Sequence, residues 1–311
     1  MPSAAGASGP HARRGLRTLL LVVVSVIALA AGLACTTPAP AERSFRGPAE
    51  SSTTHPFTKA SKLRRASVWA VGDGADGGTA AHTVVRRIAR NRVDRFLYLG
   101  DVYERGTFSE FMRRYHTVYG RFARKTTPTP GNHEWPRHAG GYDRYWKRIT
   151  GRRPPHYYSF SLAGWQILSL NSEQAHDEGS PQVQWLKSQV STPGTCRLAF
   201  WHSPRYSAGR IHRDRPDLAP LWDALRGRAT LVVNGHDHNM QRLRPIDGIT
   251  ELISGAGGHR HYPLRRDARL AFSDDRHYGA VRLTLTPGRA GFAFITSDGR
   301  KLDSGSVSCT R

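Results

Sequence analysis

Two short motifs carry the side chains best suited to chemistry: Gly-Asn-His-Glu at residues 131–134 and Gly-His-Asp-His at residues 235–238. Both follow stretches that predict buried strands. Asp73, Asp101 and His202 also come after such stretches, so five strand ends carry polar side chains. Carboxylate oxygens, amide oxygens and neutral imidazole nitrogens are ligands for divalent and trivalent metal ions. The set therefore predicts a metal centre that activates water for hydrolysis.

The elements that must position these residues alternate between strand and helix. Short connections between them predict parallel βαβ units, in which ligands bind at the carboxyl ends of the strands. The predicted strands cover residues 67–72, 95–99, 198–201 and 230–233, a hairpin covers 157–170, and later strands cover 249–254, 280–286, 292–296 and 302–307. The predicted helices cover residues 79–91, 108–122, 181–190 and 216–227.

The mixture of ligand types favours two ions rather than one. A carboxylate can bridge two ions, whereas a neutral imidazole cannot, so we expect one aspartate to lie between them. Asn132 would add a neutral oxygen and limit the negative charge of the site. His236 and His238 are two residues apart, a spacing that lets a loop direct the two imidazoles at different ions.

In this order the motifs resemble those of the calcineurin-like metallophosphoesterases, specifically the purple acid phosphatase-like branch. The resemblance covers about residues 67–305 and implies an α/β fold, a four-layer αββα sandwich of two mixed β-sheets flanked by helices. It also implies roles for individual residues. Asp73 and His238 would hold the first metal, Asp101 would bridge, Asn132, His202 and His236 would hold the second metal, and His133 would face the substrate without ligating.

The chain departs from the family pattern at two positions. Many members have a histidine ligand two residues after the first aspartate, where this chain has Ala75. Purple acid phosphatases use a tyrosine three residues after the bridging aspartate, but here Tyr103 follows Asp101 by two and Glu104 takes the third place. Two alternatives follow: Tyr103 reaches the metal through a shorter loop, or it packs elsewhere and water completes the coordination.

The predicted function is an exported phosphoesterase with two metal ions, for which Fe, Zn and Mn all suit the ligands. We expect a hydroxide shared by the ions to attack phosphorus in line, with His133 as the general acid. One alternative is a phosphodiesterase acting on nucleotide or glycerophospho substrates. Another is a non-catalytic, envelope-associated binding protein that retains the fold, for which Ala75 is the supporting feature.

Residues near the motifs in sequence are candidates for contacts with the substrate. Arg205 and His259 are cationic candidates for binding a phosphate, although such residues are more often part of the surface. Trp135, His138, Tyr142 and Trp146 either line the mouth of the pocket or, at helical spacing, belong to the core. The expected partner is a small phosphoester, and the expected state is a monomer.

The N-terminal region predicts export. Basic residues at positions 13, 14 and 17 precede an uncharged apolar run over residues 18–33, so residues 1–41 are interpreted as a signal peptide or a retained anchor. Lipidation of Cys35 is a further alternative. Residues 42–66 predict a disordered linker, 67–305 the metallophosphoesterase domain and 306–311 a tail. We therefore expect a secreted or envelope-associated protein, with association through the N-terminus.

Cysteine content and charge add two expectations. Cys196 and Cys309 form an even pair in an exported protein, so they form either a disulfide or two buried free thiols. The formal net charge of the 311 residues is +22 with neutral histidines. Because the excess arginine is dispersed and matches no nucleic-acid module, we expect no specific binding to nucleic acid.

Overall fold

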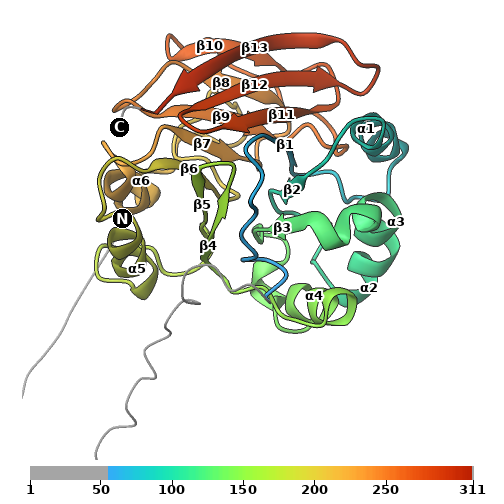
Figure 1. Cartoon of the computed structure of the whole chain (residues 1–311). Coiled ribbons are helices and arrows are strands. Elements are labelled where there is room, and N and C mark those ends of the chain that lie inside the picture. The colour runs from blue at the N-terminus through green and yellow to red at the C-terminus, as the bar shows by residue number, and fades with distance from the viewer. Residues whose placement is uncertain (1–54, 310–311) are drawn as a thin grey trace, which may run out of the picture. The chain divides into compact units, whose positions relative to one another are not determined.

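A computed structural model describes residues 55–309, all of which belong to one compact unit. The strands of this part form two mixed sheets that pack against each other (Figure 1). One sheet has the order β13-β12-β11-β1-β2-β3 and the other β10-β8-β9-β7-β6-β5-β4. The strands are β1 (Ala66–Val71), β2 (Arg95–Tyr98), β3 (Thr126–Pro128), β4 (Tyr158–Leu162), β5 (Trp165–Ser169), β6 (Cys196–Phe200), β7 (Leu231–Asn234), β8 (Met240–Leu243), β9 (Thr250–Ser254), β10 (Leu270–Asp274), β11 (Gly279–Thr286), β12 (Arg289–Thr296) and β13 (Lys301–Ser308).

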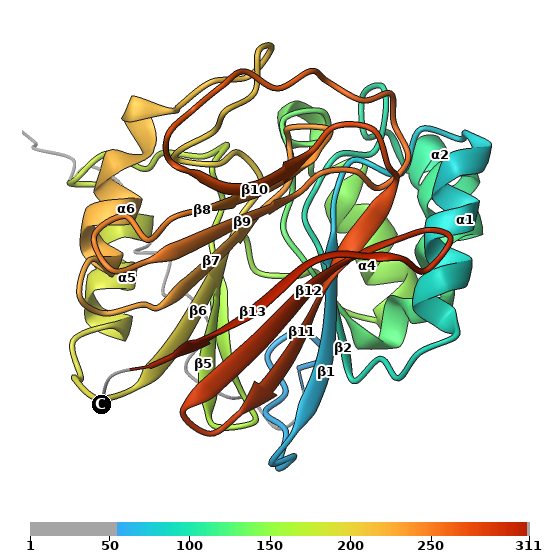
Figure 2. The same cartoon turned by 90° about the horizontal axis from the view of Figure 1, so that it is seen from above.

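Helices cover the outer faces of both sheets, so the fold is the predicted four-layer αββα sandwich (Figure 2). The helices α5 and α6 lie on the sheet that contains β6 and β7, and the others lie beside β1 and β2. They are α1 (Thr79–Ala89), α2 (Phe108–Glu110), α3 (His116–Tyr119), α4 (Tyr142–Thr150), α5 (Pro181–Gln189) and α6 (Ala219–Leu225), with the π-helical turn η1 (Phe111–Tyr115) and the 3₁₀ turns η2 (Gly120–Lys125), η3 (Trp135–Arg137) and η4 (Pro216–Leu218).

Side chains alternate across the strands as a sheet between two layers requires. On β6, Leu198 and Phe200 join the core shared by the two sheets, while Ala199 packs in the cluster under α5 and α6. On β7, Leu231 and Val233 face the shared core and Val232 faces the helices. The continuous apolar runs of these strands reflect burial on both faces.

The strands that carry the motifs run parallel, as predicted. In one sheet β1 pairs with β2 and β2 with β3 in parallel, and in the other β5, β6, β7 and β9 are successive parallel neighbours. The predicted hairpin is the antiparallel pair β4–β5. The helix predicted over residues 108–122 is instead a succession of α2, a π-helical turn, α3 and a 3₁₀ turn that extends to Lys125.

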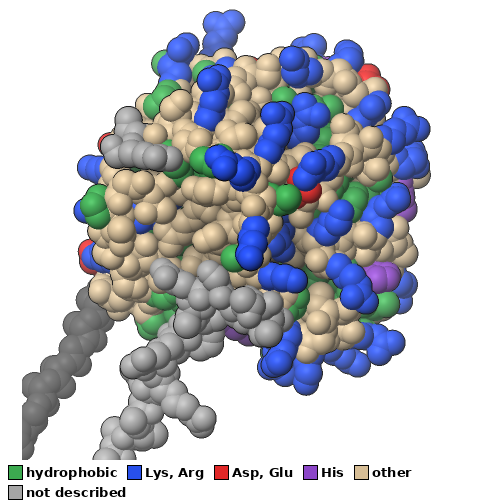
Figure 3. Space-filling model, viewed as in Figure 1, with side chains coloured by type: hydrophobic (Ala, Val, Ile, Leu, Met, Phe, Trp, Pro, Cys, Tyr) green, Lys and Arg blue, Asp and Glu red, His purple; other side chains and the backbone are tan. Residues whose placement is uncertain are grey.

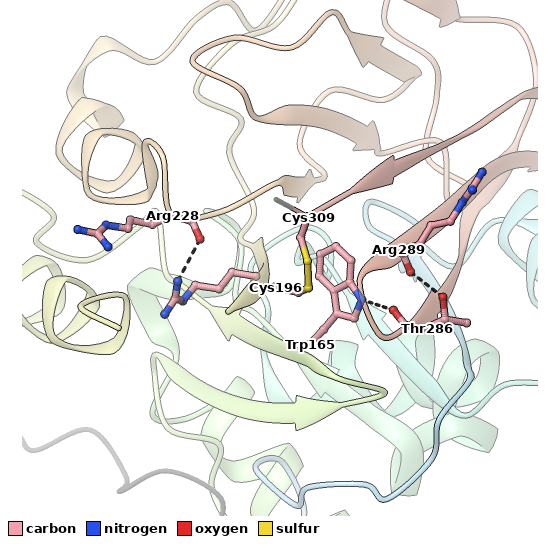
Figure 4. The surroundings of a disulfide bond; sticks show 7 residues. Trp165, Cys196, Arg228, Thr286, Arg289 and Cys309 are labelled. Atoms are coloured by element: carbon pink, nitrogen blue, oxygen red, sulfur yellow. Dashed lines mark hydrogen bonds between the residues drawn. A yellow bond between two sulfur atoms is a disulfide. The ribbon is translucent and has the colours of Figure 1, made fainter. Parts of the chain in front are cut away.

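A disulfide joins Cys196 and Cys309 (Figure 4). Cys196 begins β6 in one sheet, and Cys309 follows β13 at the edge of the other, so the bond connects the two sheets. Trp165 of β5 lies next to it and donates a hydrogen bond from Nε1 to the Thr286 carbonyl of β11 over 2.8 Å. This second contact between the sheets lies at the same end of the sandwich.

The segment before β1 lies against the domain where the structure describes it. Phe57 is buried and makes an edge-to-face contact with Trp146 of α4, with ring centroids 5.6 Å apart. The predicted export segment, Cys35 and residues 42–54 of the predicted linker lie outside the described residues. Among residues 55–309, no helix has the length and apolar character needed to cross a membrane.

Lysine and arginine side chains cover the surface more densely than aspartate and glutamate, as the net charge requires (Figure 3). They are distributed over the visible face, with few acidic side chains between them. Such a surface attracts anions over distances of about a Debye length, roughly 8 Å at physiological ionic strength.

Candidate metal centre

The predicted site residues lie just beyond the carboxyl ends of strands in both sheets. Asp73 follows β1, Asp101 follows β2 and Asn132 follows β3, while His202 follows β6 and the motif at 235–238 follows β7. Asp73, Asp101 and His236 have positive φ angles of 60°, 67° and 68°. A non-glycine residue in this region usually marks a functional constraint. Each of these three residues turns the chain sharply as it leaves its strand.

Glycines in the motifs make room for the ligands that pack against them. A Cβ atom on Gly131 would overlap Asp101 Oδ1, and one on Gly235 would lie 2.8 Å from Asp73 Oδ2. These glycines are therefore required by close approach rather than by flexibility.

One group of side chains gathers around His202. Its Nε2 lies 3.0 Å from Asn132 Oδ1, 3.1 Å from His236 Nδ1 and 3.4 Å from Asp101 Oδ1. Its Nδ1 donates to the Leu99 carbonyl over 2.7 Å, which assigns the proton to Nδ1 and leaves Nε2 facing the group. Ligand atoms of Asp101, His202 and His236 lie within 4.8 Å of one another, as those of residues that share one ion do.

A second group gathers around Asp73. Its Oδ1 lies 3.1 Å from the Tyr103 hydroxyl and 3.7 Å from His238 Nε2. His238 Nδ1 donates to the Arg260 carbonyl over 2.9 Å, so its Nε2 also faces inward. Asp73 Oδ2 accepts a hydrogen bond from the His236 amide over 2.8 Å, which connects the two groups.

Burial strongly perturbs the charges of these residues. Burial, together with the negative charge of Asp101, raises the pKa of Asp73 well above its ordinary value. Burial opposes the charge of Asp101 as well, but the neighbouring His202, His133 and His236 hold its pKa below the ordinary value. Burial lowers the pKa of His236 well below its usual value and that of His238 to about 3, so both imidazoles are neutral.

These properties fit a pair of transition-metal ions. Neutral imidazoles are the form of histidine that ligates metals, and two buried carboxylates close together need positive charge beside them. Asp73, His238 and Tyr103 would hold one ion, Asn132, His202 and His236 the other, and Asp101 would lie between them. Carbonyls on the far sides of His202 and His238 already orient their rings for this purpose.

His133 lies beside this centre without joining either group. Its Nε2 is 3.8 Å from Asp101 Oδ2, and its Nδ1 donates to the Glu104 carbonyl over 2.7 Å. The side chain is 29% exposed, whereas that of Asp101 is 2% exposed. His133 therefore presents Nε2 between the buried carboxylate and solvent.

Tyr103 reaches the centre although it is one residue closer to Asp101 than in the family pattern. Its amide donates to the Ala75 carbonyl over 3.1 Å, and the ring is 1% exposed. Its hydroxyl lies 2.8 Å from His238 Nε2, next to the two residues that the sequence assigns to the first metal. Ala75, the position of the absent histidine ligand, is fully buried.

The two residues that the sequence selects for binding substrate lie in different surroundings. His259 stacks on Tyr103 with ring centroids 4.2 Å apart, and its Nδ1 pairs with Asp76 over 3.0 Å. Arg205 stacks instead on the ring of Tyr206, with 4.3 Å from its guanidinium carbon to the ring centroid. The structure therefore places His259 beside the predicted ligands. Among the described residues, Arg205 makes no hydrogen bond or ring contact with any of them.

Sequence reasoning missed several residues that hold the ligands in place. Glu134 is buried and accepts hydrogen bonds from the amides of Asp101 and Val102 over 3.1 and 3.0 Å. Its position as the last residue of its motif was an available signal. Tyr262 packs on His238 with ring centroids 3.9 Å apart, and no local pattern marks this contact. His212, one of the basic candidates that follow His202 in the sequence, packs on His236 at the same centroid distance.

Tyr142 and Trp146 belong to the core rather than to the mouth of the site, as the alternative prediction stated. Both lie on the buried side of α4, 1% and 0% exposed. Trp135 and His138 lie outside this core and pack on each other, with ring centroids 4.3 Å apart.

The fold and the site define a calcineurin-like phosphoesterase: the family model of that description matches residues 66–240, so the chain belongs to this family. Its curated relatives are purple acid phosphatases. Probable purple acid phosphatase 20 of Arabidopsis thaliana is 25% identical over 203 residues, 55% of this chain and 45% of that protein. Purple acid phosphatase 13 of the same plant is 30% identical over 125 residues, 35% of this chain and 23% of that protein. The chain thus spans less than half the length of these relatives.

Solved structures share the fold. Purple acid phosphatase PPD1 from yellow lupin (Lupinus luteus) seeds matches with a TM-score of 0.65 at 18% identity, over 80% of this chain and 54% of that one. GAP50, described as the anchor in the inner membrane complex of Plasmodium, matches with a TM-score of 0.66 at 16% identity, over 80% and 90% of the two chains. These structures show the fold, and the curated relatives support a place in the purple acid phosphatase-like branch.

Proposed function

We propose that this protein hydrolyses phosphate esters at a centre of two metal ions. The observation that carries the proposal is the convergence of Asp73, Asp101, His202, His236 and His238, with Asn132, from five strand ends of two sheets. The purple acid phosphatases to which the chain is similar support the same class of reaction.

The two groups divide the ligands between the ions. Asp73, His238 and Tyr103 would hold the first, and Asn132, His202 and His236 would hold the second, with Asp101 available to both. When bound, the ions supply Lewis acidity and a water molecule activated for in-line attack on phosphorus. Fe, Zn and Mn all suit this set of nitrogen and oxygen ligands.

His133 is the general acid. Its Nδ1 is occupied by the Glu104 carbonyl, so the proton that it can deliver is on Nε2, which faces the centre. Asp101 Oδ2 lies 3.8 Å from this nitrogen. In the reaction Nε2 gives its proton to the ester oxygen as that oxygen leaves phosphorus.

His259 is a second candidate for contacting the substrate beside this centre, because it stacks on Tyr103 and approaches His238, with the ring centroids of His259 and His238 4.9 Å apart. Its pairing with Asp76 keeps Nδ1 engaged and directs Nε2 away from that carboxylate.

The N-terminal sequence supports export of the protein to the cell envelope or to the outside of the cell. We propose that its substrate is a small phosphoester, either a monoester or a diester, and that the protein acts as a monomer.

The test measures turnover and metal content on the full chain and on His133→Ala. We expect the wild type to bind metal and to hydrolyse members of a panel of chromogenic mono- and diesters. Loss of the general acid should lower kcat by about 10²- to 10⁴-fold on esters with poor leaving groups and much less on nitrophenyl esters, with unchanged metal content.

His82→Ala, a histidine of α1, is the matched control and should behave as the wild type. A metal-loaded wild type with no turnover above His133→Ala on any ester would refute the hydrolase and leave the non-catalytic binding protein. The ratio of monoester to diester turnover decides between phosphatase and phosphodiesterase.

A further inference from the structure

A second cluster of metal-capable side chains lies outside the centre described above. His138, Asp143 and His156 each offer a ligand atom, and these atoms lie within 4.8 Å of one another. They come from the end of η3, the first turn of α4 and the loop before β4. We propose that these three residues bind a zinc ion.

The distances within the cluster match those between ligands of one zinc ion. His138 Nδ1 lies 3.1 Å from Asp143 Oδ2, and His156 Nε2 lies 3.5 Å from Asp143 Oδ1. In a tetrahedral site with metal–ligand bonds of about 2.0–2.1 Å, neighbouring ligand atoms are about 3.3 Å apart. The two measured separations bracket this value, so an ion fits between the three groups with small side-chain adjustments.

The carboxylate at the centre of the cluster needs a cation. Asp143 is 4% exposed, and its Oδ1 has no hydrogen-bond partner among the described residues. The 3.5 Å contact with His156 is too long for an ordinary hydrogen bond. Because a buried acceptor without a partner is unfavourable, an ion at this oxygen would stabilise the folded chain.

Ring packing and a backbone hydrogen bond restrict the positions of the two imidazoles. Trp135 stacks on His138 with ring centroids 4.3 Å apart and meets His156 edge-on at 4.9 Å. The Asp143 amide donates to the His138 carbonyl over 2.8 Å, which fixes the ends of the loop between them. Such packing reduces the entropy that binding would otherwise cost.

Solvent can complete the coordination. The side chains of His138 and His156 are 30% and 25% exposed, so water can occupy a fourth position. A cavity of about 210 Å³ opens at His156, which lines it with Tyr157 and Gln174, and provides an approach for the ion. Two histidines, one carboxylate and a water molecule form a typical zinc ligand set.

The position of the cluster indicates what the ion does. His138 lies five residues after His133 on the same segment, and Asp143 belongs to α4, whose Tyr145 and Trp146 are part of the core. An ion shared by His138 and Asp143 therefore fastens the segment that carries Asn132 and His133 to a helix anchored in the core. Binding should raise the melting temperature of the whole domain.

Zinc stoichiometry tests the proposal. The full chain is treated with a chelator, reloaded with Zn²⁺, desalted and analysed for metal per protein. We expect His138→Gln and His156→Gln each to bind one equivalent less than the wild type and to lose the zinc-dependent rise in melting temperature that this site contributes. His277→Gln is the matched control: His277 also pairs with an aspartate, Asp274, over 2.9 Å, but belongs to neither ligand group found among the described residues.

The result is independent of the proposed phosphoesterase, because the difference of one equivalent counts this site alone. Equal zinc content in the wild type and both variants would overturn the proposal. If the variants fail to fold, crystals of the wild type at saturating zinc decide the question by anomalous scattering at the zinc edge. A peak between His138, Asp143 and His156 supports the site, and its absence refutes it.

Discussion

The hydroxyl of Tyr103 lies 2.8 Å from Nε2 of His238. Without metal, burial and the charge of Asp73 raise the pKa of this phenol well above its usual value. A bound cation reverses that effect, because coordination favours the deprotonated form of the ligand. Tyr103 would thus compensate for Ala75: a side chain from the neighbouring segment lies beside Asp73 and His238, where the expected histidine is absent.

The first prediction concerns a ferric form of the protein. We expect the iron-loaded wild type to show a visible charge-transfer band from phenolate to iron, and Tyr103→Phe to lose this band at unchanged iron content. The substitution keeps the ring that stacks on His259 and removes the hydroxyl alone. Absorption spectra with parallel iron analysis measure the effect.

Tyr262→Phe is the matched control, because its ring also packs on His238, with centroids 3.9 Å apart. It should keep the full band. A colourless wild type with iron bound at the centre would remove Tyr103 from the ligand set.

Glu134 carries the second prediction. Its two carboxylate oxygens accept the amides of Asp101 and Val102 and so hold the turn from which the Asp101 side chain extends. Burial and the nearby Asp101 raise its pKa to about 7. Glu134→Gln replaces one acceptor with a donor that faces an amide, and we expect metal affinity to fall about 10- to 100-fold. Competition with a chromogenic chelator measures this change.

Glu110→Gln is the comparison variant. Glu110 accepts hydrogen bonds from the amides of Glu104 and Thr107 on the same loop but does not hold Asp101. Its metal affinity should stay near the wild-type value. Equal losses in both variants would mean that general loosening of the loop, rather than the support of Asp101, sets the affinity.

The third prediction concerns the disulfide. Cys196 and Cys309 are 113 residues apart, and closing a loop of that length stabilises a protein by about 5 kcal/mol in the chain-entropy model. We expect the Cys196→Ser/Cys309→Ser double variant to lose stability of that order in urea unfolding. Turnover of the folded variant should be unchanged, because Cys196 begins β6 whereas His202 follows the other end of that strand.

The wild type treated with reductant should lose the same stability, and the double variant should not respond to reductant. Two thiols that alkylate in unreduced, unfolded wild-type protein would show that the bond does not form.

Features of the fold that depend on local sequence could be predicted, whereas features that depend on contacts between distant segments could not. The parallel strands β1, β2, β6 and β7 are short, mostly apolar and followed within a few residues by glycine or a polar residue, so their positions and their chemistry could be predicted locally. The convergence of their ends follows from the direction of parallel strands. The residues of the candidate metal centre could therefore be predicted from the sequence.

Elements without a local signal were missed. The strand β3 is three residues long and contains Pro128, and β8 and β10 pair antiparallel beyond the metal motifs. The helix α4 is short, and Asp143 stands among the large apolar residues of its buried face, which weakens its helical pattern. The cluster of His138, Asp143 and His156 depends on how α4 packs, so no spacing along the chain could reveal it.

The last prediction is a dependence of stability on pH. Glu251 of β9 is fully buried; its Oε1 accepts the Arg205 amide over 3.1 Å, and its Oε2 has no hydrogen-bond partner among the described residues. Burial raises its pKa from about 4.5 to about 8. Between these values the folded chain keeps a proton that the unfolded chain releases, so this group makes stability fall as pH rises, by up to about 1.4 kcal/mol per pH unit.

Glu251→Gln keeps an acceptor for the Arg205 amide and has no proton to lose. We expect the difference in unfolding free energy, variant minus wild type, to increase steadily from pH 5 to pH 8 and to be flat below about pH 4.5. Urea unfolding of both proteins at matched metal content gives this difference, in which the contribution of the metal centre cancels because it is common to both. Glu178→Gln, at an exposed glutamate paired with Lys187, is the comparison variant with the same replacement at the surface. A flat difference for Glu251→Gln would mean that Glu251 is ionised in the folded protein at pH 5, in which case a cation or water must reach its second oxygen.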